Sequence, residues 1–216
     1  MQENHFFELG KNRIEALSDG IFAIAMTLLV LEIHVPDLPA NTSNLDLGPA
    51  LFHLWPKFLS YFVSFLGLGI YWISHHNLYH LIRRSDGVLL WLNLFFFMFA
   101  SLLPFSASLL NAFPHSQIAP VFFGGNLTVL GWILFLLWTY AAAQPGMLAD
   151  IIDSDFRRGM RQRFIAIPCV ATLAVVICFW SSEILLATFT VLLPFYLLPI
   201  RHRLIPQEST AHPQVG

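Results

Sequence analysis

Six long apolar segments alternate with short polar stretches along this chain of 216 residues. A helix needs about 20 consecutive, mostly apolar residues to cross the hydrocarbon core of a bilayer, with roughly 17–25 accepted. The segments that meet this requirement are residues 16–33, 58–73 with flanks that reach 81, 88–110, 118–143, 164–180 and 184–200. This pattern predicts an all-α, polytopic membrane protein with six transmembrane helices.

The composition supports a bilayer as the solvent of the folded chain. Hydrophobic residues make up 56% of the sequence and charged residues 11%, whereas a soluble domain has about 45–50% and about 25%. A water-soluble core of this size cannot hide so much apolar surface. A formal net charge of -2 without a cluster of basic residues also argues against a nucleic-acid partner.

Lysines and arginines gather in alternate polar stretches. They are Lys11 and Arg13 before the first segment, Arg83 and Arg84 after the second, Arg157, Arg158, Arg161 and Arg163 after the fourth, and Arg201 and Arg203 after the sixth. The loops between these stretches contain a single lysine or arginine, Lys57. Because positively charged loops stay on the cytoplasmic side, we expect a multi-pass protein of the cell membrane with both termini cytoplasmic.

We see no second domain in the sequence. Residues 1–204 are predicted to form one transmembrane domain, and the polar, proline-bearing residues 205–216 a disordered tail. Residues 1–12 lack the order of a cleavable signal peptide, so the first segment is expected to remain as a helix. Cys169 and Cys178 fall in one apolar segment, which indicates buried thiols and not a disulfide framework.

The first segment carries the most unusual chemistry of the chain, because Ser18 and Asp19 lie about a turn inside it. An aspartate at the centre of a membrane helix costs about 2.5–3.5 kcal/mol, and less near the edge. The carboxylate therefore needs a partner, unless it lies at the interface and is solvated by water.

The second segment offers such partners in the run YWISHHNLYH, residues 71–80. Imidazole, hydroxyl and indole groups can bind a carboxylate, or accommodate an arginine, where water is scarce. We predict a structural polar network between the first two helices, made of Arg13, Ser18, Asp19, Trp72, Ser74, His75 and His76.

Three sharper interpretations compete with this network. His76 and His80 are spaced i, i+4 and so suit a metal, but no H-E-x-x-H pattern or cysteine pair adds further ligands, so no metal site or cofactor is predicted. A proton relay through Asp19 and the histidines is the second. An intramembrane enzyme is the third, but no nucleophile elbow or ligand spacing supports catalysis.

One face of the first segment is a clean aliphatic row. Steps of three and four residues join Leu17, Gly20, Ile24, Leu28 and Leu31 on one stripe. Asp19 lies about 140° away from Ile24 at roughly 100° per residue. Such a stripe alone is more typical of lipid contact or core packing than of a functional surface.

Several of these residues belong to longer motifs. They are R-x-x-x-L-S-D-G at 13–20 followed by V-L-E-I at 30–33, Y-W-I-S-H-H at 71–76, and L-N-L-F-F-F-M-F-A-S-L-L-P-F at 92–105. With these motifs the chain resembles the transmembrane protein 175 family of potassium channels over about residues 13–204. Leu17 stands where the family usually has phenylalanine, and Ser106-Ala107 where it often has Pro-Thr.

The resemblance implies a homotetramer of six-helix subunits in the bilayer, around a central pore for potassium ions that the first helix lines. Aliphatic side chains replace a T-V-G-Y-G filter, which is absent here. Carried over by position, the constriction is Ile24, Leu28 and Leu31, with Thr27 as a polar layer. The expected activity is a modest preference for K⁺ over Na⁺. A proton-coupled secondary transporter is the alternative, although its usual repeated halves are not evident.

Overall fold

The computed structural model describes residues 10–39, 41–149 and 154–178. Within these ranges the chain forms helices joined by short connections, and its all-α class is confirmed. The helices are α1 (Lys11–Val30), α2 (Asn44–Phe52), α3 (Trp55–Leu81), α4 (Gly87–Ser101), α5 (Leu103–Ala112), α6 (Ile118–Ala143) and α7 (Ser154–Cys178).

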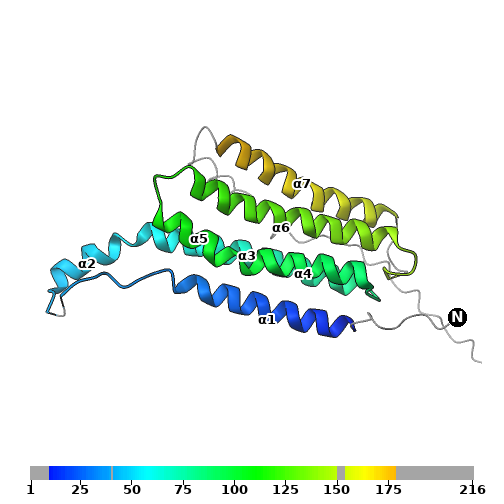
Figure 1. Cartoon of the computed structure of the whole chain (residues 1–216), viewed down its shortest axis with the longest axis horizontal. Helices are drawn as coiled ribbons and strands as arrows, with labels where there is room; N and C mark the ends of the chain where they lie inside the picture. The colour runs from blue at the N-terminus through cyan, green and yellow to red at the C-terminus, as the bar shows by residue number, and fades with distance from the viewer. Residues whose placement is uncertain (1–9, 40, 150–153, 179–216) are drawn as a thin grey trace, which may run out of the picture.

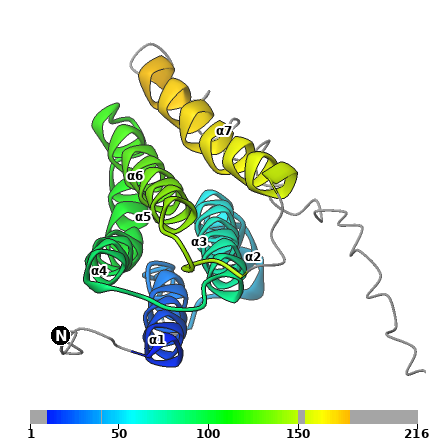
Figure 2. The ribbon, with the colours of Figure 1, turned by 90° about the vertical axis from the view of Figure 1, so that its right-hand side faces the viewer.

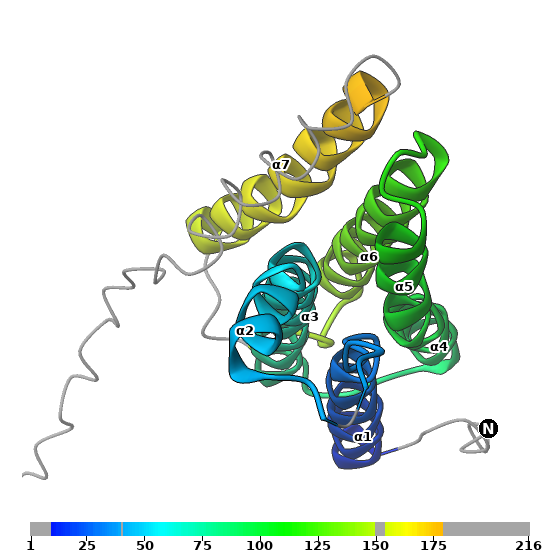
Figure 3. The ribbon, with the colours of Figure 1, turned by 90° about the vertical axis from the view of Figure 1, so that its left-hand side faces the viewer.

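The long helices run side by side along the long axis of the molecule (Figure 1). Seen along that axis, α1 and α7 lie at opposite edges of the bundle, with α3, α4, α5 and α6 between them (Figures 2 and 3). α1 packs against α3 and α4, whereas α7 packs against α6. The other described helices therefore leave a large part of the α1 surface uncovered.

Four helices in the described part of the chain are long and apolar enough to cross a membrane. They are α3, the continuous pair α4 and α5 (Gly87–Ala112), α6 and α7. α1 overlaps the first predicted segment but is not among these four helices, because four charged side chains lie in its first half. The sixth predicted segment, residues 184–200, and the tail at 205–216 lie outside the described residues.

Helix boundaries follow the prediction closely for α6 and less closely for α7. α6 spans residues 118–143, as expected from the sequence. α7 begins at Ser154 instead of residue 164, because the helix takes in the arginine-bearing stretch before the apolar run. Its Met160 and Phe164 are buried, and Phe156 and Phe164 lie against Trp138 of α6. These apolar contacts extend α7 beyond its membrane-compatible part.

The third predicted segment, residues 88–110, is divided into α4 and α5 at Leu102. Pro104 occupies the first turn of α5, where its missing N–H needs no helical partner. Hydrogen bonds between residues four apart continue across the junction, from Leu102 N to Met98 O (3.2 Å) and from Ser106 N to Leu102 O (3.1 Å). α4 and α5 therefore follow one another as a single span, Gly87–Ala112.

α2, which follows the polar loop at residues 36–42, was not predicted from the sequence. Pro49 lies inside this short helix, and Ser43 Oγ donates to Asp46 Oδ2 over 2.8 Å at its start. Its apolar side chains Leu45 and Phe52 are 86% and 78% exposed. Figure 1 shows α2 beyond the end of the bundle, which explains why it gains so little packing.

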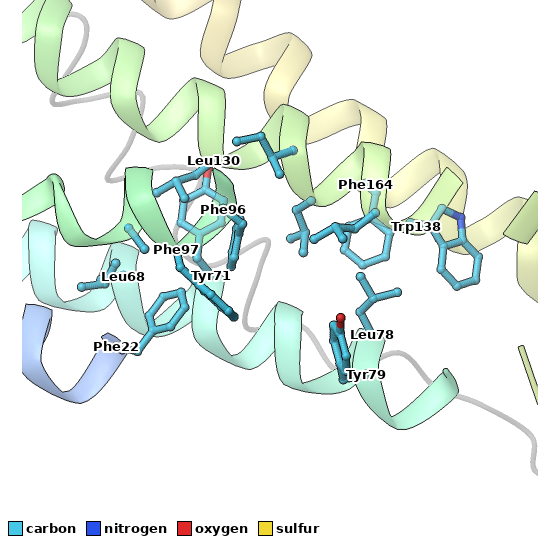
Figure 4. Packing of buried hydrophobic residues seen from close by; sticks show 14 of the residues in the cluster. Phe22, Leu68, Tyr71, Leu78, Tyr79, Phe96, Phe97, Leu130, Trp138 and Phe164 are labelled. Atoms are coloured by element: carbon cyan, nitrogen blue, oxygen red, sulfur yellow. The ribbon is translucent and has the colours of Figure 1, made fainter. Parts of the chain in front are cut away.

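Aromatic and aliphatic side chains from α1, α3, α4 and α6 fill the centre of the bundle (Figure 4). Phe96 of α4 lies between Phe22 of α1 and Tyr71 of α3, with ring centroids 5.8 and 6.4 Å apart. The Tyr71 hydroxyl donates to Leu127 O of α6 over 2.6 Å. Among the described residues, this core contacts α1 along one side.

Two connections are bound together at the end of the bundle where α3 stops. Arg83 N donates to Met147 O (2.8 Å) and Ala149 N to Leu81 O (3.0 Å), which forms a short antiparallel bridge. Asp86 caps α4 by accepting Leu89 N and also accepts the Tyr140 hydroxyl of α6, at 2.9 and 2.5 Å. The α3–α4 turn is thereby anchored to α6 and to the connection that follows it.

Candidate functional site

The α1 helix has one buried side and one open side. The buried side consists of Ile14, Ser18, Phe22, Ala25 and Leu29. On the open side, Leu17 is 45% exposed, Ile24 62%, Leu28 43% and Leu31 66%. The aliphatic row expected from the sequence is thus a real surface feature of the chain, and no other described element covers it.

Thr27 lies on the same open side as Ile24 and Leu28. Its hydroxyl donates to the Ile24 carbonyl of its own helix over 2.8 Å. The hydroxyl hydrogen is therefore used within α1, whereas the lone pairs of Oγ1 point to an exposed surface. Leu31 differs from the other three because it follows the last residue of the helix and caps it in a helical conformation.

On the buried side, Ser18 of α1 meets His75 of α3, with Oγ and Nδ1 3.2 Å apart. His75 is almost fully buried, and its Nε2 lies 2.8 Å from Asn93 Oδ1 of α4. One imidazole therefore connects three helices through its two ring nitrogens.

The partners of Asn93 determine which nitrogen of His75 carries the hydrogen. The Asn93 amide nitrogen donates to Leu89 O (2.6 Å), which can only accept, and also to the Tyr79 hydroxyl. Oδ1 must then face His75 and accept from Nε2–H. In the neutral ring Nδ1 is an acceptor, so the Ser18 hydroxyl donates to it. Every polar atom of this buried chain has a compatible partner.

Asp19 is exposed, unlike Ser18, and has a separate contact. Trp72 of α3 donates its indole N–H to Asp19 Oδ1 over 2.8 Å. The carboxylate thus has a specific donor at the edge of the α1–α3 contact. A charged acceptor makes such a hydrogen bond stronger than a neutral one.

The other residues of the proposed polar network are placed differently. Arg13 is exposed, Ser74 is half-buried, and neither makes a side-chain hydrogen bond to a described residue. His76 lies against Trp72, with its Nε2 2.9 Å from Nε2 of His80. The structure thus brings Ser18, Asp19, Trp72 and His75 into the contact between α1 and α3, and leaves Arg13, Ser74 and His76 outside its hydrogen bonds.

Sequence reasoning missed Asn93 and Tyr79, which complete the buried chain. A signal for Asn93 was present, because it is the single polar residue in the apolar run of α4 before Ser101. An amide in such a run implies a buried hydrogen-bond partner. Tyr79 gave no such signal, since tyrosine is common at both ends of membrane helices.

In the described part of the chain, no three His, Cys, Asp or Glu side chains lie close enough together to bind one metal ion. Cys169 is exposed and Cys178 is buried, and both are free thiols. The site is therefore built from aliphatic and hydrogen-bonding groups.

Comparison with known proteins gives consistent matches. Residues 13–104 match the family model described as "Endosomal/lysosomal potassium channel TMEM175". A potassium channel of Chamaesiphon minutus is 35% identical over 144 residues, which cover 65% of this chain and 70% of that protein. A potassium channel of Streptomyces collinus is 32% identical over 190 residues, which cover 85% and 90% of the two chains.

A human relative is longer. The endosomal/lysosomal proton channel TMEM175 of Homo sapiens is 31% identical over 199 residues, which cover 85% of this chain but 38% of that protein. Among solved structures, a crystal structure of a lysosomal potassium-selective channel TMEM175 homologue from Chamaesiphon minutus matches with a TM-score of 0.76 and 28% identity. The match covers 87% of this chain and 96% of that one. The chain therefore belongs to the TMEM175 family of membrane ion channels.

Proposed function

We propose that this chain is the subunit of a potassium channel in which α1 lines the pore. Three relatives from different organisms, each covered by this chain over at least 70% of its length, are named potassium channels. A structurally similar homologue is described as potassium-selective. A channel passes ions without chemical conversion, so no catalytic residue is required. The proposed assembly is a homotetramer, because a closed ring can enclose an aqueous path that a single subunit lacks.

The observation that carries the proposal is the uncovered aliphatic side of α1. Ile24 and Leu31 are more than 60% exposed, while the opposite side of the same helix is held by Ser18 and by the aromatic core. Because α1 packs against its own subunit on one side and is exposed on the other, the exposed side can face a symmetry axis shared by four copies.

Conduction in this proposal depends on a narrow apolar throat. Rings of Ile24, Leu28 and Leu31 side chains exclude water when they are close together, and so close the path to ions. The exposed Thr27 hydroxyl adds a ring of oxygen atoms between them, which can replace part of a cation's water shell. Because K⁺ gives up its water more readily than Na⁺, a modest preference for K⁺ follows.

The membrane arrangement that we propose has six spans, both termini in the cytoplasm, and a location in the cell membrane. The distribution of lysine and arginine supports the orientation. α1 serves as the first span and residues 184–200 as the sixth, within one domain of residues 1–204.

Cysteine accessibility tests the pore directly. In a Cys169→Ser background, Ile24→Cys and Leu28→Cys should react with a membrane-impermeant thiol reagent, and the reaction should reduce K⁺ flux in proteoliposomes. Leu94→Cys is the matched control, because this α4 residue is also exposed in one chain, at 40%. It should react slowly, since lipid covers it.

Two results would contradict the proposal. If cysteines at 24 and 28 do not react with the reagent in any condition while K⁺ flux is normal, α1 does not line the ion path. If native mass spectrometry finds only monomers, the four-subunit pore is wrong.

A proton-coupled process is the second candidate, because the longer vertebrate relatives are named proton channels. The same proteoliposomes distinguish the two with a pH-sensitive dye. A channel carries K⁺ down its electrochemical gradient at fixed pH, whereas a coupled transporter moves K⁺ only when protons move as well.

A further inference from the structure

Two histidines near the end of α3 lie outside the hydrogen bonds that join α1 to α3. His76 and His80 are one helical turn apart, and their Nε2 atoms are separated by 2.9 Å. Their planes are nearly perpendicular, at 88°, with ring centroids 4.4 Å apart. We propose that this pair binds a divalent transition-metal ion, with Cu²⁺ preferred over Ni²⁺ and Zn²⁺.

The distance between the two nitrogens fits a metal chelate. Imidazole nitrogens bind such ions at about 2.0–2.1 Å, so two ligands at a right angle lie roughly 2.9 Å apart. A tetrahedral angle would separate them by roughly 3.4 Å. The observed 2.9 Å between His76 and His80 thus matches a square-planar site, which is the geometry of Cu²⁺ and Ni²⁺.

The first ligand is already held in place. The His76 ring stacks on Trp72 with centroids 5.7 Å apart and planes 23° apart, and Trp72 is itself bound to Asp19. An ion that arrives therefore has to order only the His80 side chain. Ligands that are positioned in advance lose less entropy on binding.

The pair is accessible and lies near the C-terminal end of α3. His80 is exposed, and it occupies the last turn of α3, which ends at Leu81. The free carbonyl groups at a helix C-terminus favour a cation. The guanidinium of Arg84, which follows α3, is directed to the Pro145 carbonyl at 3.1 Å.

Binding changes the tautomer of one ring. In the metal-free pair one Nε2–H donates to the lone pair of the other Nε2. An ion needs lone pairs on both, so the hydrogen of the donor ring moves to its Nδ1 through solvent. Both rings stay neutral, and water molecules complete the coordination because the described residues supply no third ligand.

Copper titration of the untagged, full-length protein in detergent tests the site. With CuCl₂, electron paramagnetic resonance should show a centre with two nitrogen ligands, and calorimetry should show tighter binding for Cu²⁺ than for NiCl₂ or ZnCl₂. His76→Gln and His80→Gln should each weaken the binding by about 10–100-fold or more, since changes even outside the ligands have effects of that size. His53→Gln, which removes another exposed histidine, should leave the binding unchanged.

A second readout locates the ion. Bound Cu²⁺ quenches nearby indole fluorescence, so quenching should fall in Trp72→Phe and remain in Trp91→Phe. Unchanged copper affinity in both His76→Gln and His80→Gln would refute the site, as would a copper signal with a single nitrogen ligand. Neither result bears on the proposed pore, because the copper titration reads side chains of α3, whereas the cysteine-accessibility test reads side chains of α1.

Discussion

Trp72 on α3 donates its indole N–H to the Asp19 carboxylate on α1, with 2.8 Å between Nε1 and Oδ1. This hydrogen bond and the buried one between Ser18 and His75 lie at neighbouring positions of α1. Together they fix the rotation of α1 about its own axis. The rotation decides which residues remain on the open side.

Trp72→Phe should lower the thermal stability of the protein, because phenylalanine keeps most of the ring but cannot donate to Asp19. The expected loss is about 1 kcal/mol, or roughly 2–4 °C in the melting temperature for a chain of this size. Trp91→Phe is the control, since Trp91 is 62% exposed on α4. Thermal unfolding followed by light scattering measures both variants. Equal changes in melting temperature would show that the hydrogen bond to Asp19 does not contribute to stability.

Asn93→Leu should be among the most damaging polar substitutions. It leaves His75 Nε2–H and the Tyr79 hydroxyl buried without their partner, at about 1–3 kcal/mol for each stranded group. Asn126→Leu provides the comparison, because Asn126 Oδ1 has no partner among the described residues and Ser106 keeps its bond to Leu102 O. Size-exclusion yield and melting temperature should fall clearly more for the variant at 93.

Two buried serines should respond differently to alanine. Ser18→Ala removes the donor to His75 and should destabilise the α1–α3 contact by about 1 kcal/mol. Ser64→Ala should be neutral or stabilising, because Ser64 Oγ is buried in α3 without a hydrogen-bond partner among the described residues. Denaturation of the two variants in detergent measures the difference, and a greater loss for Ser64→Ala would contradict this reasoning.

Gly131→Ala should weaken the packing of α7 on α6. A Cβ at this position would lie 3.2 Å from Cβ of Pro168 and 3.3 Å from the Tyr71 hydroxyl oxygen, closer than ordinary contact. Gly125→Ala in the same helix meets nothing within 4 Å and should stabilise α6 by about 0.5–1 kcal/mol. Opposite shifts in melting temperature are expected, and a gain for Gly131→Ala would mean that α7 can move away without loss.

Ile24→Asn and Leu28→Asn should raise the open probability or conductance and reduce the preference for K⁺, because an amide wets the aliphatic throat. Single-channel recording in planar bilayers measures both quantities. Leu94→Asn should leave the current unchanged. If the variants at 24 and 28 conduct like the unmodified protein, the proposed constriction lies elsewhere.

The helical class, the limits of α6 and the aliphatic stripe of α1 were predictable from local sequence, because apolar length and a period of 3.6 residues depend only on neighbours along the chain. α2 was not predictable in the same way. Its proline, Pro49, and its polar flank are typical of a loop, and it buries none of its residues, so no apolar period marks it.

The partners of the polar residues were decided by tertiary structure alone. The sequence indicated that Ser18 and Asp19 needed partners in residues 71–80, but it could not assign His75 to one and Trp72 to the other. That assignment depends on how α1 and α3 are rotated against each other, which the packing of Phe22, Tyr71 and Phe96 determines. Asn93 joins them because α4 lies against the same face, a proximity between residues that are far apart in the chain.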